Sequence, residues 1–470
     1  PAAGSRTPAR GVSAAALPRA KAAAGAAPGG AWLLAALVAA FIGVLLLWPI
    51  ATVLHTAFVD GEGRATLAHF AAFFSLSLMR ESFLNSVVVA LASVALATIL
   101  AVPLAYLTVR FRFRGSALVQ TLGVLPLIMP PFVGAVAMQL IFGRNGSVNL
   151  ILNNAFGFRI PFMDGLNGVV FVEGLHYYPF ILLNLIASMR NIDGAMEEAA
   201  QNLGAHGFRL FRRVVFPLAL PGYVAGAALV FVKVFDDLGT PLVLNVTNML
   251  APQAYLRITS VGLEDPVGYV IAVIMILFSI AALALAARVT RGRDYATINR
   301  GGSATARRRL EGWRATAAYG FVLLVLALVL TPHVGILLLS VSRVWSFSVL
   351  PESFTLAHYA TVLTDSSRMI GNTILYSGLA AGIDVVIGVA IAWLVLRTKL
   401  PGRRWLDWSA SAALAIPGLV LAIGYLRAFR GLELPFGMGA FTASWLAIML
   451  AYSVRRLPYA VRSCVASLEQ

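Results

Sequence analysis

Charged side chains are scarce in this 470-residue chain, where Asp, Glu, Lys and Arg make up 12% and hydrophobic residues 59%. A soluble domain carries about 25% charged residues, so the composition excludes a soluble globular protein. The apolar residues come in runs of roughly 20 or more, the length that crosses a bilayer as a helix. Because backbone groups in lipid must be hydrogen-bonded within their segment, these runs favour helices. The sequence therefore predicts an all-α membrane protein.

Several reactive groups are missing as well. Cys464 is the only cysteine, which excludes an intrachain disulfide and a cysteine-based metal site. The sequence contains no Gly-x-x-x-x-Gly-Lys-Ser/Thr phosphate loop, so the chain is not expected to hydrolyse ATP itself. His, Asp and Glu do not cluster at ligand spacing, so we predict no catalytic residue, no metal site and no cofactor in this chain. These absences argue against an enzyme embedded in the membrane.

Ten apolar segments are expected to span the membrane as helices. They lie at 31–58, 82–109, 117–142, 169–189, 217–244, 267–290, 315–342, 369–396, 405–428 and 441–456. Prolines interrupt helical hydrogen bonding. We therefore expect local kinks or breaks at Pro49, Pro103, Pro130 and Pro332.

The basic residues indicate how these spans are oriented. With the N-terminus in the cytoplasm, the inward-facing pieces hold 26 of the 36 Lys and Arg residues, and the outward loops hold nine. This asymmetry follows the positive-inside rule and explains a net charge of +16 without a nucleic-acid partner. Residues 1–30 are predicted to be a disordered basic tail. A signal peptide is the alternative, but the apolar run from Ala31 to Phe58 is too long for one.

The sequence also repeats itself. The segment that starts at Asn85 matches the segment that starts at Asn372, an offset of 287, and Arg110 pairs with Arg397 at the same offset. Each complete half holds six spans, an even number, so both halves face the same way. The prediction is a tandem parallel repeat of six-helix halves, related by an axis along the membrane normal.

The repeat defines the expected domains. Residues 31–290 form the first half, 291–314 a cytoplasmic linker, and 315–470 a second half with four spans. A further match pairs Asn191 with Gln470, an offset of 279. Since the first half continues for roughly another hundred residues beyond this point, the second half is expected to be truncated before its last two spans.

An unusual loop at 191–222 joins the fourth and fifth predicted spans. Asp193 can cap a short helix over 194–203, and Gly204 is placed to end it, since glycine adopts the left-handed conformation easily. Alanines within that helix offer a small-residue surface that another protein can approach closely. Apolar residues and arginines then alternate over 208–215, which is typical of a helix at a membrane interface.

This loop resembles the EAA loop of binding-protein-dependent ABC importer permeases. The residues that match the motif, or lie beside it, are Glu197, Glu198, Ala199, Ala200, Gly204, Ala205, Val214 and Pro217. The resemblance implies that the short helix docks on a separate ATPase subunit and transmits its closure. ATP and magnesium would then be bound by that partner.

The two fused halves look most like the ferric-iron branch of these permeases. Residues 231–242 resemble a stretch of that branch, with Leu238 where Phe is usual. The cargo implied is ferric iron, and phosphonate, polyamine and thiamine permeases remain alternatives. The expected partners are two ATPase subunits, a periplasmic solute-binding protein and the lipid of the inner membrane. A secondary transporter with two parallel six-helix halves is the alternative class.

Charges inside predicted spans mark candidates for the translocation path, because such residues are rare and usually functional. These are Lys233, Asp236, Asp237 and Asp384. Lys233 and Asp237 are four residues apart, so a local ion pair is an equally good interpretation.

Three neighbouring residues could in principle bind ferric iron: His176, Tyr177 and Tyr178. We expect them instead to belong to an aromatic belt at the membrane interface.

Overall fold

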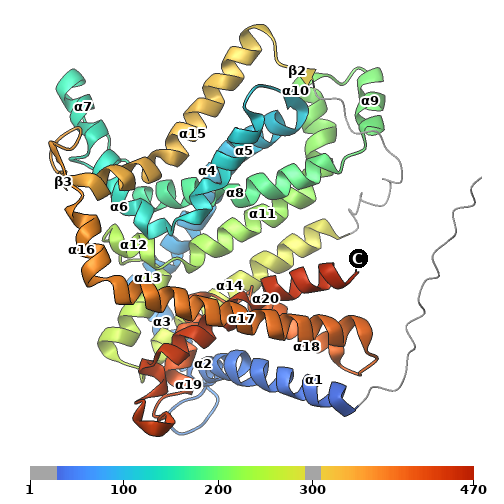
Figure 1. Cartoon of the computed structure of the whole chain (residues 1–470), viewed down its shortest axis with the longest axis vertical. Coiled ribbons are helices and arrows are strands. Elements are labelled where there is room, and N and C mark those ends of the chain that lie inside the picture. Colours follow the sequence, from blue (N-terminus) through green and yellow to red (C-terminus); the bar gives the residue numbers. More distant parts are fainter. Residues whose placement is uncertain (1–28, 292–307, 470) are drawn as a thin grey trace, which may run out of the picture.

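The computed structural model describes residues 29–291 and 308–469, and these residues are predominantly helical (Figure 1). The expectation of an all-α membrane protein is confirmed. The predicted tail 1–30 and linker 291–314 lie largely outside the described residues. Before the gap the helices are α1 (Gly29–Ile42), α2 (Trp48–Phe58), α3 (Ala68–Ser75), α4 (Ser77–Arg110), α5 (Ser116–Val124), α6 (Pro131–Phe142), α7 (Ser147–Phe156), α8 (Gly165–Arg190), α9 (Gly194–Asn202), α10 (Gly207–Leu210), α11 (Phe216–Asp236), α12 (Gly239–Val243), α13 (Leu250–Leu256) and α14 (Pro266–Thr290).

Six helices follow the gap. They are α15 (Gly312–Val341), α16 (Ala357–Asp365), α17 (Ser367–Arg397), α18 (Arg403–Ala412), α19 (Gly418–Ala428) and α20 (Trp445–Glu469). The strands are very short: β1 (Phe111–Arg112) pairs in parallel with β2 (Arg308–Arg309), and β3 (Ser342–Val344) pairs antiparallel with β4 (Ser353–Phe354). Most long helices run in similar directions, with α9 and the end of α20 on one side and α7 and α16 on the other (Figure 1).

Seven of the described helices are long and apolar enough to cross a membrane. They are Gly29–Phe58 (α1 with α2), α4, α8, Gly207–Asp236 (α10 with α11), α14, α15 and α17. The count is eight if the pair Ser116–Ile128 and Pro131–Phe156, bent by 103°, forms one span.

Three of the ten predicted spans, 117–142, 405–428 and 441–456, are therefore not among these seven helices. The segment 117–142 breaks where Met129 and Pro130 take extended conformations, so the break expected at Pro130 is confirmed. The segment 405–428 is likewise two helices, α18 and α19, and Pro417 is extended between them. Proline disfavours a helical conformation in the residue before it and cannot donate a backbone hydrogen bond, which explains both interruptions.

Two boundaries also differ from the prediction. The span expected at 217–244 begins earlier and ends at Asp236, and α12 follows as a separate short helix. The segment 441–456 covers only the first part of α20, so Arg455 lies inside a helix instead of in an inward loop. A carboxylate partner on α11, described below, allows this charge to remain inside the bundle.

Several elements recur with matched ends. Helices α4 and α17 end 287 residues apart, at Arg110 and Arg397. The helix that follows each begins after a left-handed glycine, Gly115 with φ 82° and Gly402 with φ 78°. Gly29–Phe58 and α15 each have 30 residues. The local structure thus follows the internal repeat of the sequence.

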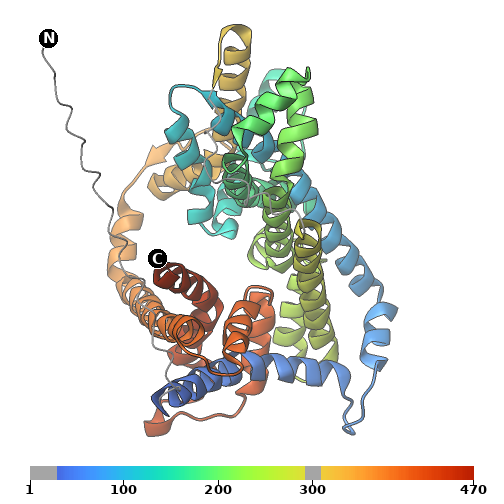
Figure 2. The same ribbon diagram turned by 90° about the vertical axis from the view of Figure 1, so that its right-hand side faces the viewer.

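The first span of each predicted half packs against the other half. Val38, Ile42 and Leu46 lie in one buried cluster with Ile391 and Val461, whose helices are α17 and α20. Helix α15 packs instead against α5 and α6. Figure 2 shows this exchange, with α1 in dark blue beside the orange and red helices and α15 in gold beside the teal ones.

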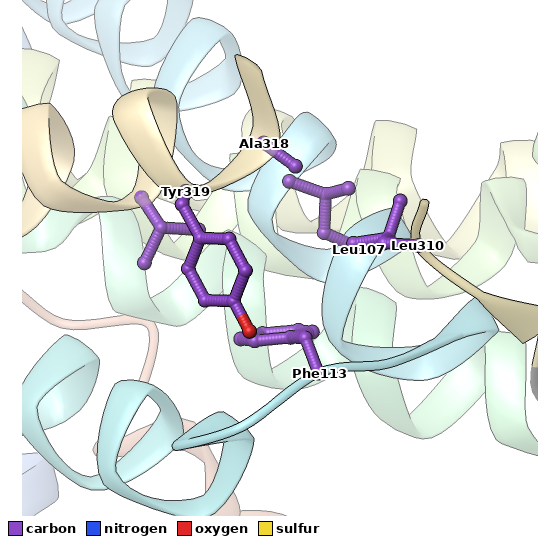
Figure 3. A pocket seen from close by; sticks show the side chains of 6 residues that line it. Leu107, Phe113, Leu310, Ala318 and Tyr319 are labelled. Atoms are coloured by element: carbon purple, nitrogen blue, oxygen red, sulfur yellow. The ribbon is translucent and has the colours of Figure 1, made fainter. Parts of the chain in front are cut away.

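A small apolar pocket lies where the start of α15 meets the end of α4 (Figure 3). The rings of Phe113 and Tyr319 meet edge-on with centroids 5.9 Å apart, and Leu107 and Leu310 complete the wall. The Tyr319 hydroxyl accepts a hydrogen bond from the Arg114 backbone nitrogen at 3.0 Å. These contacts fix the beginning of α15 on the first half.

Candidate coupling loop and intramembrane polar cluster

The loop after α8 forms the short helix that its sequence predicts. Asp193 is the N-cap residue, and its carboxylate accepts a hydrogen bond from Ala195 N at 3.0 Å. Gly204 has φ 83°, and Ala205 N donates back to Ala200 O at 2.9 Å, which closes the end of the helix. Helix α9 therefore starts and ends sharply, one residue shorter than predicted.

One face of this loop is open. Glu198 and Ala199 are exposed, Ala200 is half-buried, and the apolar side chains of Leu203 and Phe208 are 89% and 75% exposed. Apolar side chains gathered on a protruding element indicate a contact surface for another protein. We call the exposed residues of α9, together with Leu203 and Phe208, the α9 face.

The other side of α9 is held by a buried ion pair. Glu197 is 3% exposed and pairs with Arg110 at the end of α4, itself 7% exposed. Arg110 also donates to Met189 O of α8 at 3.3 Å. The sequence motif grouped Glu197 with Glu198, but the two carboxylates point to different surroundings. The sequence analysis paired Arg110 with Arg397 in the internal repeat but did not predict a functional role for Arg110.

After a turn at 203–206, the chain returns to the bundle as a helix. Residues 207–236 form one long helix with a π-helical turn at Phe211–Val215. Val214 is half-buried and Val215 buried, and the Phe211 ring packs edge-on against Tyr106 at 4.9 Å. Pro217 follows this π-helical turn and cannot donate a backbone hydrogen bond to the turn before it. Phe208 of the α9 face thus lies on the same continuous helix as α11.

At its far end α11 meets the second half. Asp236 accepts hydrogen bonds from Arg455 of α20 at 3.0 Å and from Gly418 N, the first residue of α19, at 2.9 Å. The Asp236 side chain is 10% exposed. A side chain added at Gly418 would collide with the Arg455 guanidinium, so these three groups are closely packed. Asp236 therefore links the two halves inside the bundle.

The other predicted path residues have different surroundings. Asp237 ends α11 and accepts a hydrogen bond from Thr240 N at 2.8 Å. No ion pair joins Lys233 and Asp237 in the described part of the chain; Lys233 interacts with Asp236, Arg455 and Arg456.

Asp384 is 6% exposed and is the acceptor for the Ser453 hydroxyl at 2.6 Å, so it connects α17 to α20. The structure brings Lys233, Asp236 and Asp237 together around one end of α11. It does not bring Asp384 into direct contact with them.

A further carboxyl group lies nearby that the sequence analysis did not single out. Glu173 of α8 is fully buried and interacts with Asp237 and with Thr240. Glu173 could have been identified from the sequence as a further candidate, because it is a charged residue inside a predicted span and such residues are rare.

The expectation of an interfacial aromatic belt is wrong for the residues that follow Glu173. His176, Tyr177 and Tyr178 are 9%, 8% and 0% exposed and lie inside the bundle. The Tyr178 hydroxyl donates to Gly123 O. A hydrogen-bonded hydroxyl in the core is a structural feature, and it accounts for Tyr178 without a ligand.

A third polar contact joins the halves on the side away from α9. Glu264, just before α14, pairs with Arg427 at 3.0 Å and with Arg430. Hydrogen bonds from Arg427 and then Arg430 lower the pKa of the Glu264 carboxyl below its usual value. Because Glu264 is 67% exposed at its side chain, water and salt screen this contact strongly.

Comparison with known proteins places the chain in a family. The profile described as "Binding-protein-dependent transport system inner membrane component" matches residues 93–295. The molybdenum transport system permease protein ModB of Haemophilus influenzae is 33% identical over 165 residues, which cover 35% of this chain and 71% of that protein. The chain therefore belongs to the binding-protein-dependent transport system inner membrane components. It is a multi-pass membrane protein of a family of transport components, not enzymes.

Two other relatives match a larger share of this chain. A Haemophilus influenzae protein named as a ferric transport system permease, FbpB 1, is 26% identical over 385 residues, 79% of this chain and 59% of that protein. A Salmonella typhimurium protein named as a 2-aminoethylphosphonate transport system permease, PhnU, is 28% identical over 259 residues, 54% of this chain and 90% of that protein. The chain spans 54–59% of the length of the ferric transport relatives it matches.

Proposed function

We propose that this chain is the membrane-spanning permease of an ATP-binding-cassette importer. A periplasmic binding protein delivers the solute, and two separate ATPase subunits hydrolyse ATP and hold its magnesium. The α9 face carries this proposal. Its helix is fixed on one side by the buried pair of Arg110 and Glu197 and is exposed on the side where a partner would dock.

The same loop supports a mechanism of coupling. A force applied to the α9 face reaches α4 and α8 through Arg110, which contacts both Glu197 and Met189. It reaches α11 through the continuous helix 207–236. Because α11 ends at Asp236, which bonds to α19 and α20, closure of a partner at one side of the bundle can move the contacts between the two halves.

The coupling role is tested by two substitutions that leave the bundle core untouched. Gly204→Val forces a β-branched residue into the left-handed conformation, at a cost of roughly 1–2 kcal/mol. Glu198→Lys reverses charge on the α9 face without touching the buried pair. In cells that express the permease with its ATPase and binding protein, both variants should reduce solute uptake and cargo-stimulated ATP hydrolysis together.

The control for these variants is Glu62→Gln, an exposed position on the side away from α9. It should leave uptake and ATP hydrolysis unchanged. Normal uptake by both loop variants, with the ATPase still bound, would show that the α9 face does not couple. A secondary transporter would show uptake that depends on an ion gradient and is indifferent to both loop variants.

The proposal includes an orientation and an architecture. We place the N-terminus and the α9 face in the cytoplasm and group the spans as two parallel six-helix halves. The basic residues and the recurring helix ends support this arrangement. An impermeant thiol reagent on intact cells should label Asp60→Cys but not Glu198→Cys, each in a Cys464→Ser background. The opposite labelling would reverse the orientation.

For the cargo we propose ferric iron, because two relatives that match 79% of the chain carry ferric transport names. Phosphonate and molybdate are competing cargoes, because other relatives carry phosphonate and molybdenum transport names. Polyamine and thiamine are the further alternatives that the sequence analysis left open. Uptake of labelled iron, competed with each of the other solutes, separates them. Uptake that a phosphonate abolishes and that iron does not compete would overturn the ferric assignment.

A further inference from the structure

Glu173 has surroundings that no other acidic residue named above shares. It lies on α8 with no exposed surface, and neither carboxylate oxygen has a hydrogen-bond partner among the described residues. The side chains that interact with its carboxyl group are Asp237, a second acid, and Thr240. The Thr240 hydroxyl is also fully buried without a hydrogen bond in the described part of the chain. The carboxylate of Glu173 and the hydroxyl of Thr240 are thus buried without hydrogen bonds, next to Asp237, which accepts a hydrogen bond from the Thr240 backbone nitrogen.

Among the described residues, no ion pair joins a basic side chain to Glu173 or to Asp237. Arg455 pairs with the neighbouring Asp236, and His176 is the basic side chain that interacts with Asp237. Ionised carboxylates removed from water cost several kcal/mol each unless they are paired, and two side by side repel each other. The negative charge of Glu173 and Asp237 must therefore be balanced, either by a shared proton or by a bound cation.

One member of the group is partly exposed. Asp237 is half-buried and lies at the break between α11 and α12, where the helix stops inside the bundle. Interrupted helices within a membrane protein are tolerated where they line a cavity or a polar passage. A positive ion that arrives at Asp237 would meet the buried Glu173 and Thr240 directly behind it.

We propose that Glu173, Asp237 and Thr240 form a weak binding site for a hard cation on the passage between the two halves. Carboxylate and hydroxyl oxygens are the ligands that hard cations prefer. The described residues contain no group of three His, Cys, Asp or Glu side chains that could hold a metal ion firmly. A site with two carboxylates instead suits an ion that must enter and leave again. The idea that transported cations bind here in transit rests on the proposed importer function. Binding of a cation to Glu173, Asp237 and Thr240 does not depend on that function.

Terbium ion is a suitable probe, because it is a hard trivalent cation whose luminescence is excited through nearby aromatic rings. Tyr177 interacts with both Glu173 and Asp237 and can serve as that ring. The full chain in lipid nanodiscs should show saturable terbium luminescence on excitation of its aromatic residues. Glu173→Gln and Asp237→Asn should each weaken terbium binding by about tenfold or more, since loss of even a supporting group costs 10–100-fold.

The control is Glu62→Gln, an exposed acid on an outer loop, which should bind terbium as the parent does. Asp237→Asn keeps the test informative if Glu173→Gln fails to fold, because Asp237 is only half-buried. Saturable binding that both variants retain would place the cation elsewhere. Absence of saturable binding by the parent would mean that a shared proton alone neutralises the two carboxyl groups. Either result overturns this site while leaving the importer proposal to its own uptake test.

Discussion

The ends of α4 and α17 make the same backbone contact in very different settings. Arg110 donates to Met189 O at 3.3 Å, and Arg397, 287 residues later, donates to Leu468 O at 3.1 Å. Arg110 is buried with Glu197, whereas Arg397 is exposed. The difference comes from α9, which covers Arg110 and brings it a carboxylate. The arginine is thus part of the repeated scaffold, and the loop turns it into a buried ion pair.

The largest effect is expected when Arg110, the buried arginine of this pair of positions, is replaced. Arg110→Ala removes the arginine from its buried ion pair with Glu197 and should destabilise the α9 segment by about 3–5 kcal/mol, the usual cost of breaking such a pair. Hydrogen exchange of the α9 amides, measured on the protein in nanodiscs, would then accelerate strongly. Arg397→Ala is the matched control and should change stability by less than about 1 kcal/mol, since its side chain is exposed. Equal effects at the two positions would contradict the role given to α9.

A second comparison concerns two neighbouring acids at the end of α11. Asp236→Asn should loosen α19 by about 1–2 kcal/mol, because Asp236 accepts charged and backbone hydrogen bonds across the halves and Arg455 is partly exposed. Exchange of the first α19 amides reports this change. Asp237→Asn should leave α19 unaffected, because its hydrogen bond stays within the first half. Similar exchange in both variants would show that α19 does not depend on Asp236.

The smallest expected effect lies on the side away from α9. Since the pKa of Glu264 is lowered in the folded protein, its pairing with Arg427 and Arg430 contributes stability above the ordinary pKa of a glutamate. That contribution disappears as the pH falls through the lowered value. Thermal unfolding followed from neutral to acidic pH should therefore show a slight loss that Glu264→Gln lacks, and high salt should reduce the difference. An unchanged pH profile in Glu264→Gln would assign the acid sensitivity to other carboxyl groups.

Local features could be predicted well from the sequence. The cap at Asp193, the left-handed Gly204 and the break at Pro130 all follow from backbone preferences of single residues, and all occur. The membrane helices were also predictable, because composition alone decides that lipid surrounds them. The internal repeat gave matched helix ends that the structure reproduces.

Features that depend on residues far apart in the chain could not be predicted in this way. Periodicity does not reveal that Asp236 bonds to Gly418 and Arg455, which follow it by 182 and 219 residues. The same holds for the exchange of first spans. Glu173 was visible in the sequence, but its importance depends on which side chains surround it, and only packing shows that they are acidic or neutral.

The exchanged first spans have a consequence for biosynthesis. The buried residues of α17 that share a cluster with Ile42 of α1 begin at Ala390, 348 residues further along the chain. At about 5–20 residues per second, the ribosome needs roughly 20–70 s to reach them. During that time α1 has lipid as its main neighbour, which its apolar sequence permits. The insertion machinery must therefore release the first helix and later allow the last ones to find it, so the two halves mature as one unit and not in succession.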